Sequence, residues 1–448
     1  MTSFSSDNIS QRTIQRRAVE AVIWGTPAVN FDRMFQAMVH DAKAGEGSNR
    51  IVYWSHLFNW KNQTLTPNPD SIYFMPFFNT KDVGPVVIEV PPADGGSITG
   101  SIDDCWQTAI ADVGPAGTDQ GKGGKYLLLP PGYKDKAPSG YIALETVNYQ
   151  GYALLRSILK SNSEEDVEAA VAYGKHIEIY PLSQGAHPPE TSFIDAIDVL
   201  YDATIPWDMR FFESLNRIVQ TEPWLTRDKV MIDQLRSIGL EKGKPFNPDT
   251  ATQEILKHAI AEAHAWLAHN YETRYFPPPF YPGGHWFVPA SAEVARGMST
   301  FFADPDSYPV DSRGTMYTLG FFSAKHFGAG QAYLRLSRTR TAINLTAAPP
   351  TASTFRPTRL SASTGPRPCT TATLMRSSAT RRGQAALPRH RGCKRTPTAP
   401  STSISDPKPR KARNPTGYPP APAVASRRSS VFMDLRRLLP KRPGNCPT

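Results

Sequence analysis

The stretch Gly84–Pro92, GPVVIEVPP, is a run of mostly β-branched residues enclosed by Gly and Pro. Such a run between turn residues is typical of a short strand. Three similar runs follow before residue 160: GSITGSI at 96–102, GKYLLLPPGY at 124–133 and YALLRSIL at 152–159. Short strands at this spacing predict a β-sandwich or barrel.

Helical patterns stand on both sides of this region. Residues 10–24 predict a short amphipathic helix, and residues 163–272 hold several segments of helical period that begin near Asp, Ser or Thr. The aromatic, glycine-rich stretch 283–334 predicts strands again. We therefore predict an α+β fold: a β-rich, sandwich or jelly-roll-like N-terminal domain with helical insertions, a truncated second β domain and a disordered tail.

The domain boundaries follow these changes of pattern. We place the β-rich domain at 1–160, a helical segment that packs on it at 161–280, the start of the second β domain at 281–334 and the tail at 335–448. The tail carries 23 Lys and Arg against two acids, whereas residues 1–334 carry 27 Lys and Arg against 38 Asp and Glu. The overall charge of +10 therefore belongs to the tail. It does not indicate a nucleic-acid partner for the rest of the chain.

The sequence contains few motifs that indicate a cellular location, a metal or a cofactor. The N-terminus lacks the apolar core of a secretory signal, and no run of 18 apolar residues occurs, so we expect a cytoplasmic protein with no membrane partner. Cys105 is the one cysteine before the tail, and the three tail cysteines match no zinc spacing. We predict no metal site, and no motif identifies a cofactor.

Two polar motifs supply the candidate site. One is TPNPDSIYF at 66–74, and the other is DDCWQ at 103–107. A carboxylate beside an aromatic ring suits a polar ligand, although a turn of acids with a buried Trp explains the second motif equally well. The predicted catalytic residues are Asp70, Asp103 and Asp104, and the predicted substrate-binding residues are Asn68, Tyr73, Trp106, Gln107 and Arg156.

Arg156 is a candidate because it lies inside the apolar run YALLRSIL. A buried Arg needs a carboxylate partner, which either Asp70 or Asp103 can supply. Such a contact is a structural ion pair, a ligand clamp or both.

Several motifs occur in an order that resembles the tandem DUF1254/DUF1214 family, whose two domains have unknown function. They are RRAVEAVIWGTPAVNFDRM at 16–34, TPNPDSIYFMPFF at 66–78, GPVVIEVPP, DDCWQ, GGKYLLLPPGY at 123–133, YPLSQ at 180–184, FFADPDSYPVDSRG at 301–314 and FFSAKHFGAGQAYL at 321–334. The resemblance covers residues 12–334. It implies a β-rich first domain with helical insertions, a jelly-roll-like second domain and a homo-oligomer, but no settled reaction.

After residue 334 the amino-acid sequence no longer resembles this family. The resemblance continues when codons for the same residues are read in a different reading frame. The segment STGPRPCT at 363–370 can be encoded by codons that, read one base earlier, give KYWSATVY, a segment that the resemblance leads us to expect there. The same offset gives GPESNWVPT from ARNPTGYPP at 412–420 and AWKLPD from the last seven residues. We therefore predict that residues 335–448 are an out-of-frame translation.

Two classes of function remain open at this point. The first is a protein that binds or transforms a small polar molecule in a cleft of the β-rich domain. The alternative is a non-catalytic structural or oligomer-forming protein whose aromatic segments make subunit contacts. A basic arm that binds nucleic acid is not expected, because the tail is predicted to be out of frame.

Overall fold

The structure is a computed structural model, and it describes residues 5–45, 47–68, 70–273, 286–327, 333–336 and 432–434. Most of the predicted tail, 335–448, lies outside these residues. Within it, the structure places the strand β15 (Phe432–Asp434) antiparallel to β14 (Tyr333–Leu336), which pairs in turn with β13 (Trp286–Phe287).

Two open sheets form the strand-rich part of the molecule. The six-stranded sheet has the order β11 (Ser192–Asp195), β1 (Arg50–Tyr53), β3 (Ser71–Asn79), β9 (Gln150–Ile158), β5 (Ile98–Asp104) and β6 (Ala109–Val113). The four-stranded sheet has the order β10 (Glu178–Pro181), β4 (Val86–Val90), β7 (Gly124–Leu129) and β8 (Ile142–Glu145). A short parallel pair joins β2 (Asn62–Gln63) to β12 (Tyr201–Asp202).

The stretch GPVVIEVPP contains strand β4, and its pleat explains why two sheets pack together. Val86, Ile88 and Val90 belong to a buried cluster that also holds Ile72, Phe74 and Leu155 of the six-stranded sheet. Val87 points the other way, into a small cluster on the outer face. Alternate side chains of a strand face opposite sides, so β4 is buried on both faces. The predicted α+β fold with packed sheets is confirmed, whereas a jelly-roll arrangement stays a prediction.

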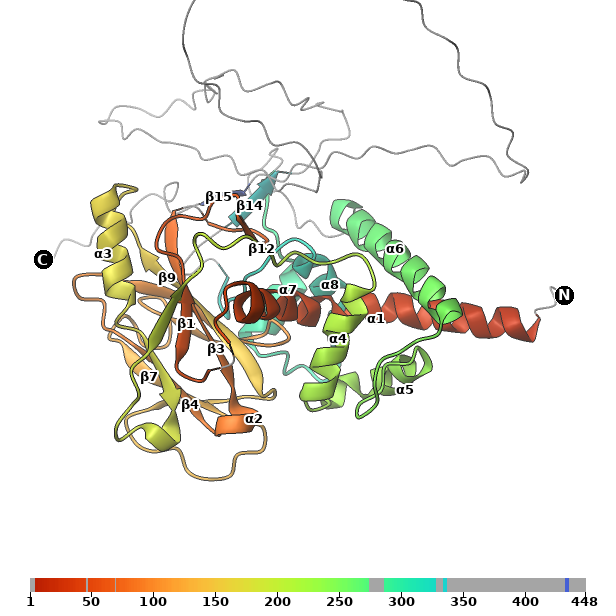
Figure 1. Ribbon diagram of the computed structural model, residues 1–448, viewed down its shortest axis with the longest axis horizontal. Helices are drawn as coiled ribbons and strands as arrows, with labels where there is room; N and C mark the ends of the chain where they lie inside the picture. The colour runs from red at the N-terminus through yellow and green to blue at the C-terminus, as the bar shows by residue number, and fades with distance from the viewer. Residues whose placement is uncertain are drawn as a thin grey trace, which may run out of the picture.

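One face of the six-stranded sheet packs on the four-stranded sheet, and helices cover the opposite face (Figure 1). The long helix α1 (Ser6–Gln36) continues into a π-helical turn, η1 (Ala37–Asp41). Around it lie α4 (Arg210–Thr221), α5 (Lys229–Ser237), α6 (Thr250–Thr273) and α8 (Val310–Tyr317). The remaining helical elements are α2 (Thr80–Val83), α3 (Glu164–Gly174), η2 (Leu182–Gln184), η3 (Thr226–Asp228) and α7 (Ala292–Ser299). A large core joins these helices to the sheet.

Helix α1 is twice as long as the predicted segment 10–24, because Pro27 does not end it. A proline lacks an N–H, so the carbonyl of Ile23 loses its helical partner. Gly314 of α8 packs directly on this carbonyl, since a Cβ at position 314 would lie 2.6 Å from Ile23 O. Close packing at Gly314 thus covers the turn of α1 in which the Ile23 carbonyl lacks a helical hydrogen bond.

The prediction of strands throughout 283–334 is wrong over two segments, which form α7 and α8. The aromatic residues there suggested strands, but Val294, Met298 and Met316 are instead buried against other helices in the large core. Tertiary packing decides the structure of such short segments.

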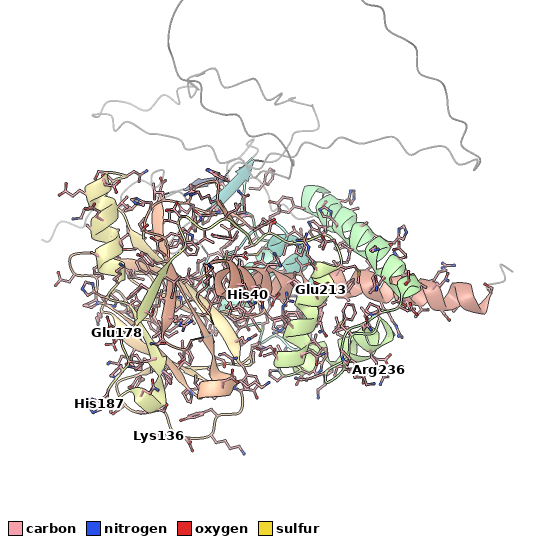
Figure 2. The ribbon with its side chains drawn as sticks, in the orientation of Figure 1. His40, Lys136, Glu178, His187, Glu213 and Arg236 are labelled. Atoms are coloured by element: carbon pink, nitrogen blue, oxygen red, sulfur yellow. The ribbon has the colours of Figure 1, made fainter. Side chains whose placement is uncertain are left out.

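Charged side chains surround both halves of the molecule. Figure 2 shows Lys136 and Glu178 at the strand-rich end and Arg236 at the helical end. Among the described residues, no helix combines the length and apolar character that crossing a bilayer requires.

Candidate functional site

The predicted site residues fall into two groups on the helix-facing side of the six-stranded sheet. Arg156 pairs with Tyr73 across β9 and β3, near the N-terminal end of β3. Asp103 pairs with Tyr152, four residues away along β9. At about 3.3 Å per residue the two groups stand roughly 13 Å apart along the strands.

Asn68, Tyr73 and Arg156 form the first group, and all three are buried. The backbone N–H of Asn68 donates to Tyr73 Oη at 3.0 Å, while the Arg156 guanidinium lies over the Tyr73 ring at 5.3 Å. A cation over an aromatic face is stabilised by the ring quadrupole. The structure therefore brings these three predicted residues together.

Asp70 lies beside this group in a local turn. Its N–H donates to Asn68 Oδ1 at 2.8 Å, and its carboxylate accepts from Asn162 at 3.3 Å. Within the described part of the chain, neither Asp70 nor Asp103 lies within ion-pair distance of Arg156. The Arg156 guanidinium therefore contacts the Tyr73 ring and not the carboxylate that the sequence led us to expect.

Asp104 and Trp106 belong to the tight turn between β5 and β6. Asp104 Oδ1 accepts from the N–H groups of Trp106 (2.9 Å) and Thr108 (2.8 Å), as a turn-forming Asp commonly does. Burial raises the pKa of Asp104 despite these hydrogen bonds and the charges of Arg227 and Arg313. Its second oxygen, Oδ2, is buried without a hydrogen-bond partner.

Gln107 is the centre of a buried polar network. Its Nε2 donates to Asn30 at 2.8 Å, and its Oε1 accepts from the hydroxyl of Tyr152. Its backbone carbonyl accepts from Tyr317 (2.7 Å) and Ser323 (3.1 Å). This residue joins α1, the sheet and α8, so its polar atoms are used within the protein.

Asp103 is fully buried, and its pKa is raised well above the usual range by burial and by the charges of Asp112 and Asp104. The geometry agrees. Ser101 Oγ lies 2.8 Å from Asp103 Oδ2 and 2.9 Å from the carbonyl of Ser323. One hydroxyl hydrogen cannot serve two acceptors, so a protonated Asp103 that donates to Ser101 satisfies both contacts.

We therefore expect Asp103→Asn to change the free energy of unfolding at pH 7 by less than about 1 kcal/mol, because an amide also donates to Ser101. Asp119 gives the matched contrast. Its carboxylate accepts from Gly114 N (2.6 Å), Gly123 N (3.3 Å) and Tyr126 Oη (2.7 Å). Asp119→Asn turns an amide donor toward these donors, and we expect a loss of about 2 kcal/mol. Urea unfolding of both variants measures the difference; equal losses would contradict a protonated Asp103.

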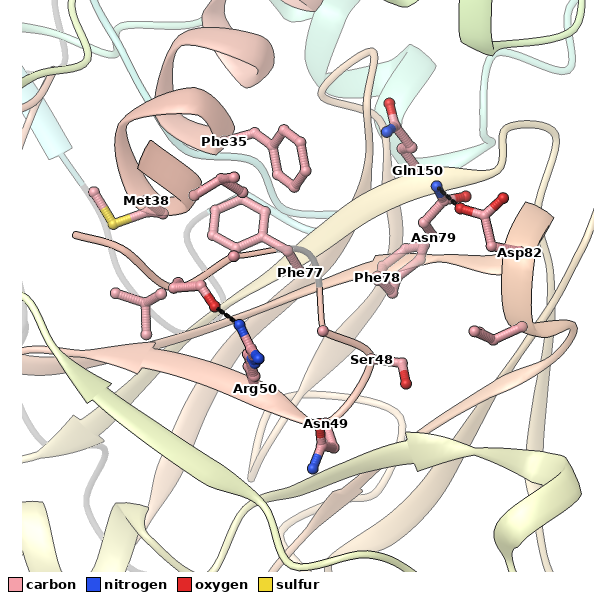
Figure 3. A pocket seen from close by; sticks show the side chains of 16 residues that line it. Phe35, Met38, Ser48, Asn49, Arg50, Phe77, Phe78, Asn79, Asp82 and Gln150 are labelled. Atoms are coloured by element: carbon pink, nitrogen blue, oxygen red, sulfur yellow. Dashed lines mark hydrogen bonds between the residues drawn. The ribbon is translucent and has the colours of Figure 1, made fainter. Parts of the chain in front are cut away.

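A pocket of about 360 Å³ opens elsewhere, between the end of α1 and the strands β1, β3 and β9. Phe35, Met38, Phe77 and Phe78 contribute its apolar wall. Figure 3 shows Arg50 on one side of this pocket and the hydrogen-bonded pair Asn79–Asp82 on the other. Gln150, at the start of β9, also lines it.

None of the eight predicted residues lines this pocket. Sequence reasoning missed Arg50 because a basic residue before an apolar strand is a common solubilising feature. The signal that marks it is the glycine pair Gly45 and Gly47. Side chains at these positions would collide with the Arg50 guanidinium, which donates to the carbonyl of Ala44. Close wrapping of the backbone therefore holds Arg50 in place.

A second group missed by sequence reasoning is the pair Asp112–His326. Asp112 accepts from the backbone N–H groups of Lys325 (2.7 Å) and His326 (2.9 Å) and from His326 Nδ1 (2.9 Å). The carboxylate requires a proton on Nδ1, and the ring that carries it is 62% exposed. Among the described residues, no three His, Cys, Asp or Glu side chains gather as metal ligands do.

Comparisons with known proteins match one part of the chain to a family model. No curated protein matches it. The VPA0106 protein from Vibrio parahaemolyticus, known from a crystal structure, is similar in structure with a TM-score of 0.49 and 16% sequence identity, over 72% of this chain and 70% of that chain. Residues 48–181 match the family model described as "Protein of unknown function (DUF1254)", and this range holds every strand of the two sheets except β11.

Proposed function

We propose that the protein binds a small amphiphilic anion, a carboxylate with an aromatic or branched aliphatic body, in the pocket beside Arg50. The observation that carries this proposal is a cavity of about 360 Å³ that joins a phenylalanine wall to a guanidinium held by its own loop. Pockets for small molecules have volumes of roughly 300–1,000 Å³ and combine apolar walls with a few fixed polar groups.

The apolar wall favours the body of such a ligand. The rings of Phe35 and Phe77 lie 5.5 Å apart in an edge-to-face arrangement. Both belong to the packed region between α1 and β3. Their geometry is therefore fixed before a ligand enters, which lowers the entropic cost of binding.

The polar groups favour an anionic end. Arg50 contributes a guanidinium with several donors, of which one is used by Ala44 O. The carboxylate of Asp82 is engaged by Asn79 Nδ2 at 2.8 Å on the opposite side of the pocket. A ligand whose carboxylate faces Arg50 avoids repulsion from Asp82 and gains a charge-assisted hydrogen bond.

Calorimetric titration with three probes of one shape tests the proposal: 3-phenylpropionate, the neutral 3-phenylpropanol and the cationic 3-phenylpropylamine. We expect the carboxylate to bind at least about 10-fold more tightly than the alcohol, which corresponds to about 1.4 kcal/mol. Arg50→Met removes this preference, and Ser48→Trp, which fills the pocket from its loop, weakens all three probes.

Lys160→Met is the matched control, because it removes an exposed cation outside the pocket. Its affinities should equal those of the wild type. Absence of binding by all probes, or binding that Ser48→Trp leaves unchanged, would reject a ligand in this pocket. A carboxylate preference that survives in Arg50→Met would reject the role of Arg50 alone.

We also propose that residues 335–448 are translated out of frame and that the in-frame product continues with a DUF1214-like second β domain and forms a homo-oligomer. The hidden KYWSATVY segment supports this reading. Sequencing the gene across codon 333 tests it. A frame that is intact there, together with peptides of the tail in the mature protein, would contradict it.

A further inference from the structure

We propose that the ligand of the pocket beside Arg50 is a zwitterion whose carboxylate lies at Arg50 and whose ammonium group lies at Asp82, at opposite ends of an apolar body. The proposal rests on the proposed function and adds the class of the ligand. It favours ω-amino acids with an aromatic or long aliphatic body, because their two charges are far apart. It disfavours α-amino acids, which carry both charges on one carbon atom.

The pocket has one charged side chain of each sign. Of the described residues that line it, only Arg50 is basic and only Asp82 is acidic. They stand on opposite sides of the cavity (Figure 3). Within the described part of the chain, neither side chain belongs to an ion pair. A ligand can therefore supply a counter-charge to each of them.

The strand register separates the two charges. The pairing of β1 with β3 places Arg50 opposite Phe77. Asn79, which holds Asp82 by a hydrogen bond, lies two residues further along β3. At about 3.3 Å per residue and about 4.8 Å between strands, the backbone positions of Arg50 and Asn79 are roughly 8 Å apart. A benzene ring with a substituent at each end can bridge such a separation, whereas two groups on one carbon atom cannot.

Asp82 keeps one carboxylate oxygen for a ligand. Asn79 is the N-cap of α2, and its side chain accepts from the N–H of Lys81 at 3.1 Å and donates to Asp82 Oδ2 at 2.8 Å. Such a capping pair holds the carboxylate in position before a ligand binds. Among the described residues, Asp82 Oδ1 has no hydrogen-bond partner. This oxygen is free to accept from an ammonium group.

Gln150 adds a second acceptor at the acidic end. It pairs directly with Asn79 across β9 and β3, so the two side chains share one face of the sheet. Its side-chain amide makes no hydrogen bond to the part of the chain that the structure describes. The carbonyl oxygen of this amide can accept from an ammonium group beside Asp82. The backbone N–H of Gln150 donates to Glu222 at 3.0 Å, which fixes the residue in the wall of the pocket.

The apolar wall lies between the two charged ends. Phe77 stands opposite Arg50 and two residues before Asn79, and its ring packs edge to face on Phe35 at 5.5 Å. An apolar body that bridges the two ends therefore covers these rings and is removed from water. An ammonium group next to the carboxylate would instead face the Arg50 guanidinium, which repels it.

Calorimetric titration of the full chain tests the zwitterion with 3-[4-(aminomethyl)phenyl]propionate and its isostere 3-(4-ethylphenyl)propionate, which lacks the positive charge. We expect the aminomethyl compound to bind at least about 5-fold more tightly at low salt, the upper range for an exposed ion pair. Added sodium chloride should reduce this ratio, because Asp82 is exposed. Phenylalanine should bind more weakly than 3-phenylpropionate.

Asp82→Asn removes the charge but keeps an oxygen for the Asn79 amide, and we expect it to abolish the preference for the aminomethyl compound. Asp135→Asn, at an exposed position outside the pocket, is the matched control and should keep the preference. The comparison of probes on the wild type remains decisive if Asp82→Asn does not fold.

Two failures can be told apart. Equal affinities of the aminomethyl and ethyl compounds for the wild type overturn the zwitterion but leave the carboxylate site in place. The same holds if phenylalanine binds as tightly as the aminomethyl compound, or if a folded Asp82→Asn keeps the preference. If none of the probes binds, the proposed function and this inference are both rejected.

Discussion

Replacing Gln107 by Ala should lower the free energy of unfolding by about 3–5 kcal/mol, the largest loss that we expect from one polar side chain. The variant leaves Asn30 Oδ1 and the Tyr152 hydroxyl without their partner in the buried interior. Each buried polar group that loses its partner costs about 1–3 kcal/mol. Urea denaturation at pH 7 measures the change.

The backbone conformation of Gln107 adds a second comparison, between Ala and Gly at this position. Its φ is +60°, a conformation in which glycine is favoured over alanine. Gln107→Gly should therefore be more stable than Gln107→Ala by roughly 1 kcal/mol, in contrast to the usual order. Gln184→Ala, at an exposed position, should change stability by less than about 0.5 kcal/mol. A Gln107→Ala variant as stable as Gln184→Ala would show that the network contributes nothing.

Gln107 also illustrates how far the sequence alone can locate a site. The motif DDCWQ left a ligand site and a turn of acids with a buried Trp equally open, and the structure places Asp104 and the positive φ of Gln107 in a tight turn. The sequence could not show that Asn30, 77 positions earlier, and Tyr317, 210 positions later, meet Gln107 there. Such long-range contacts decide whether a polar residue faces a ligand or the interior.

The fold could be predicted best where the local pattern and the burial agree. Strand β4 is enclosed by turn residues and buried on both faces, so its sequence predicts a strand and no other element. Helix α8 is different, since the segment around Gly314 combines helix-breaking and aromatic residues. Its structure depends on contact with α1, and no local pattern records that contact.

The same limit applies to the candidate pocket. Phe77 and Gln150 each look like ordinary strand residues, and Arg50 looks like an ordinary surface cation. Only the packing of η1 beside β1 and β3 brings them around one cavity. Seven of the eight predicted site residues, in contrast, are buried inside the protein, and Asp70 is half-buried.

Glu222 gives the second large effect, a stability that falls as the pH rises. Its carboxylate is 4% exposed and accepts from the N–H groups of Tyr149 (2.6 Å) and Gln150 (3.0 Å). Burial raises the pKa of Glu222 from 4.5 to about 7, and the charge of Asp104 adds to the shift, although the hydrogen bonds oppose it. Gln150 lines the pocket, so Glu222 also anchors one of its walls.

The sign follows from proton binding. Between pH 4.5 and 7 the native state holds a proton on Glu222 that the unfolded chain has released, so a rise in pH favours unfolding. A shift of this size corresponds to about 3 kcal/mol, present in full below pH 4.5 and lost above pH 7. The raised pKa values of Asp103 and Asp104 act in the same direction.

Urea denaturation at intervals from pH 4.5 to 8.5 should therefore show the highest stability at the acidic end. In Glu222→Gln the dependence on pH should become flatter by about 3 kcal/mol, because an amide does not titrate. That variant should also be less stable than the wild type at pH 5, since its NH₂ group faces a backbone donor. Glu165→Gln, at an exposed position of α3, should keep the dependence of the wild type. If Glu222→Gln keeps it as well, Glu222 is not the titrating group, and the slope must come from the other acids with raised pKa values, which include Asp103, Asp104 and Glu20.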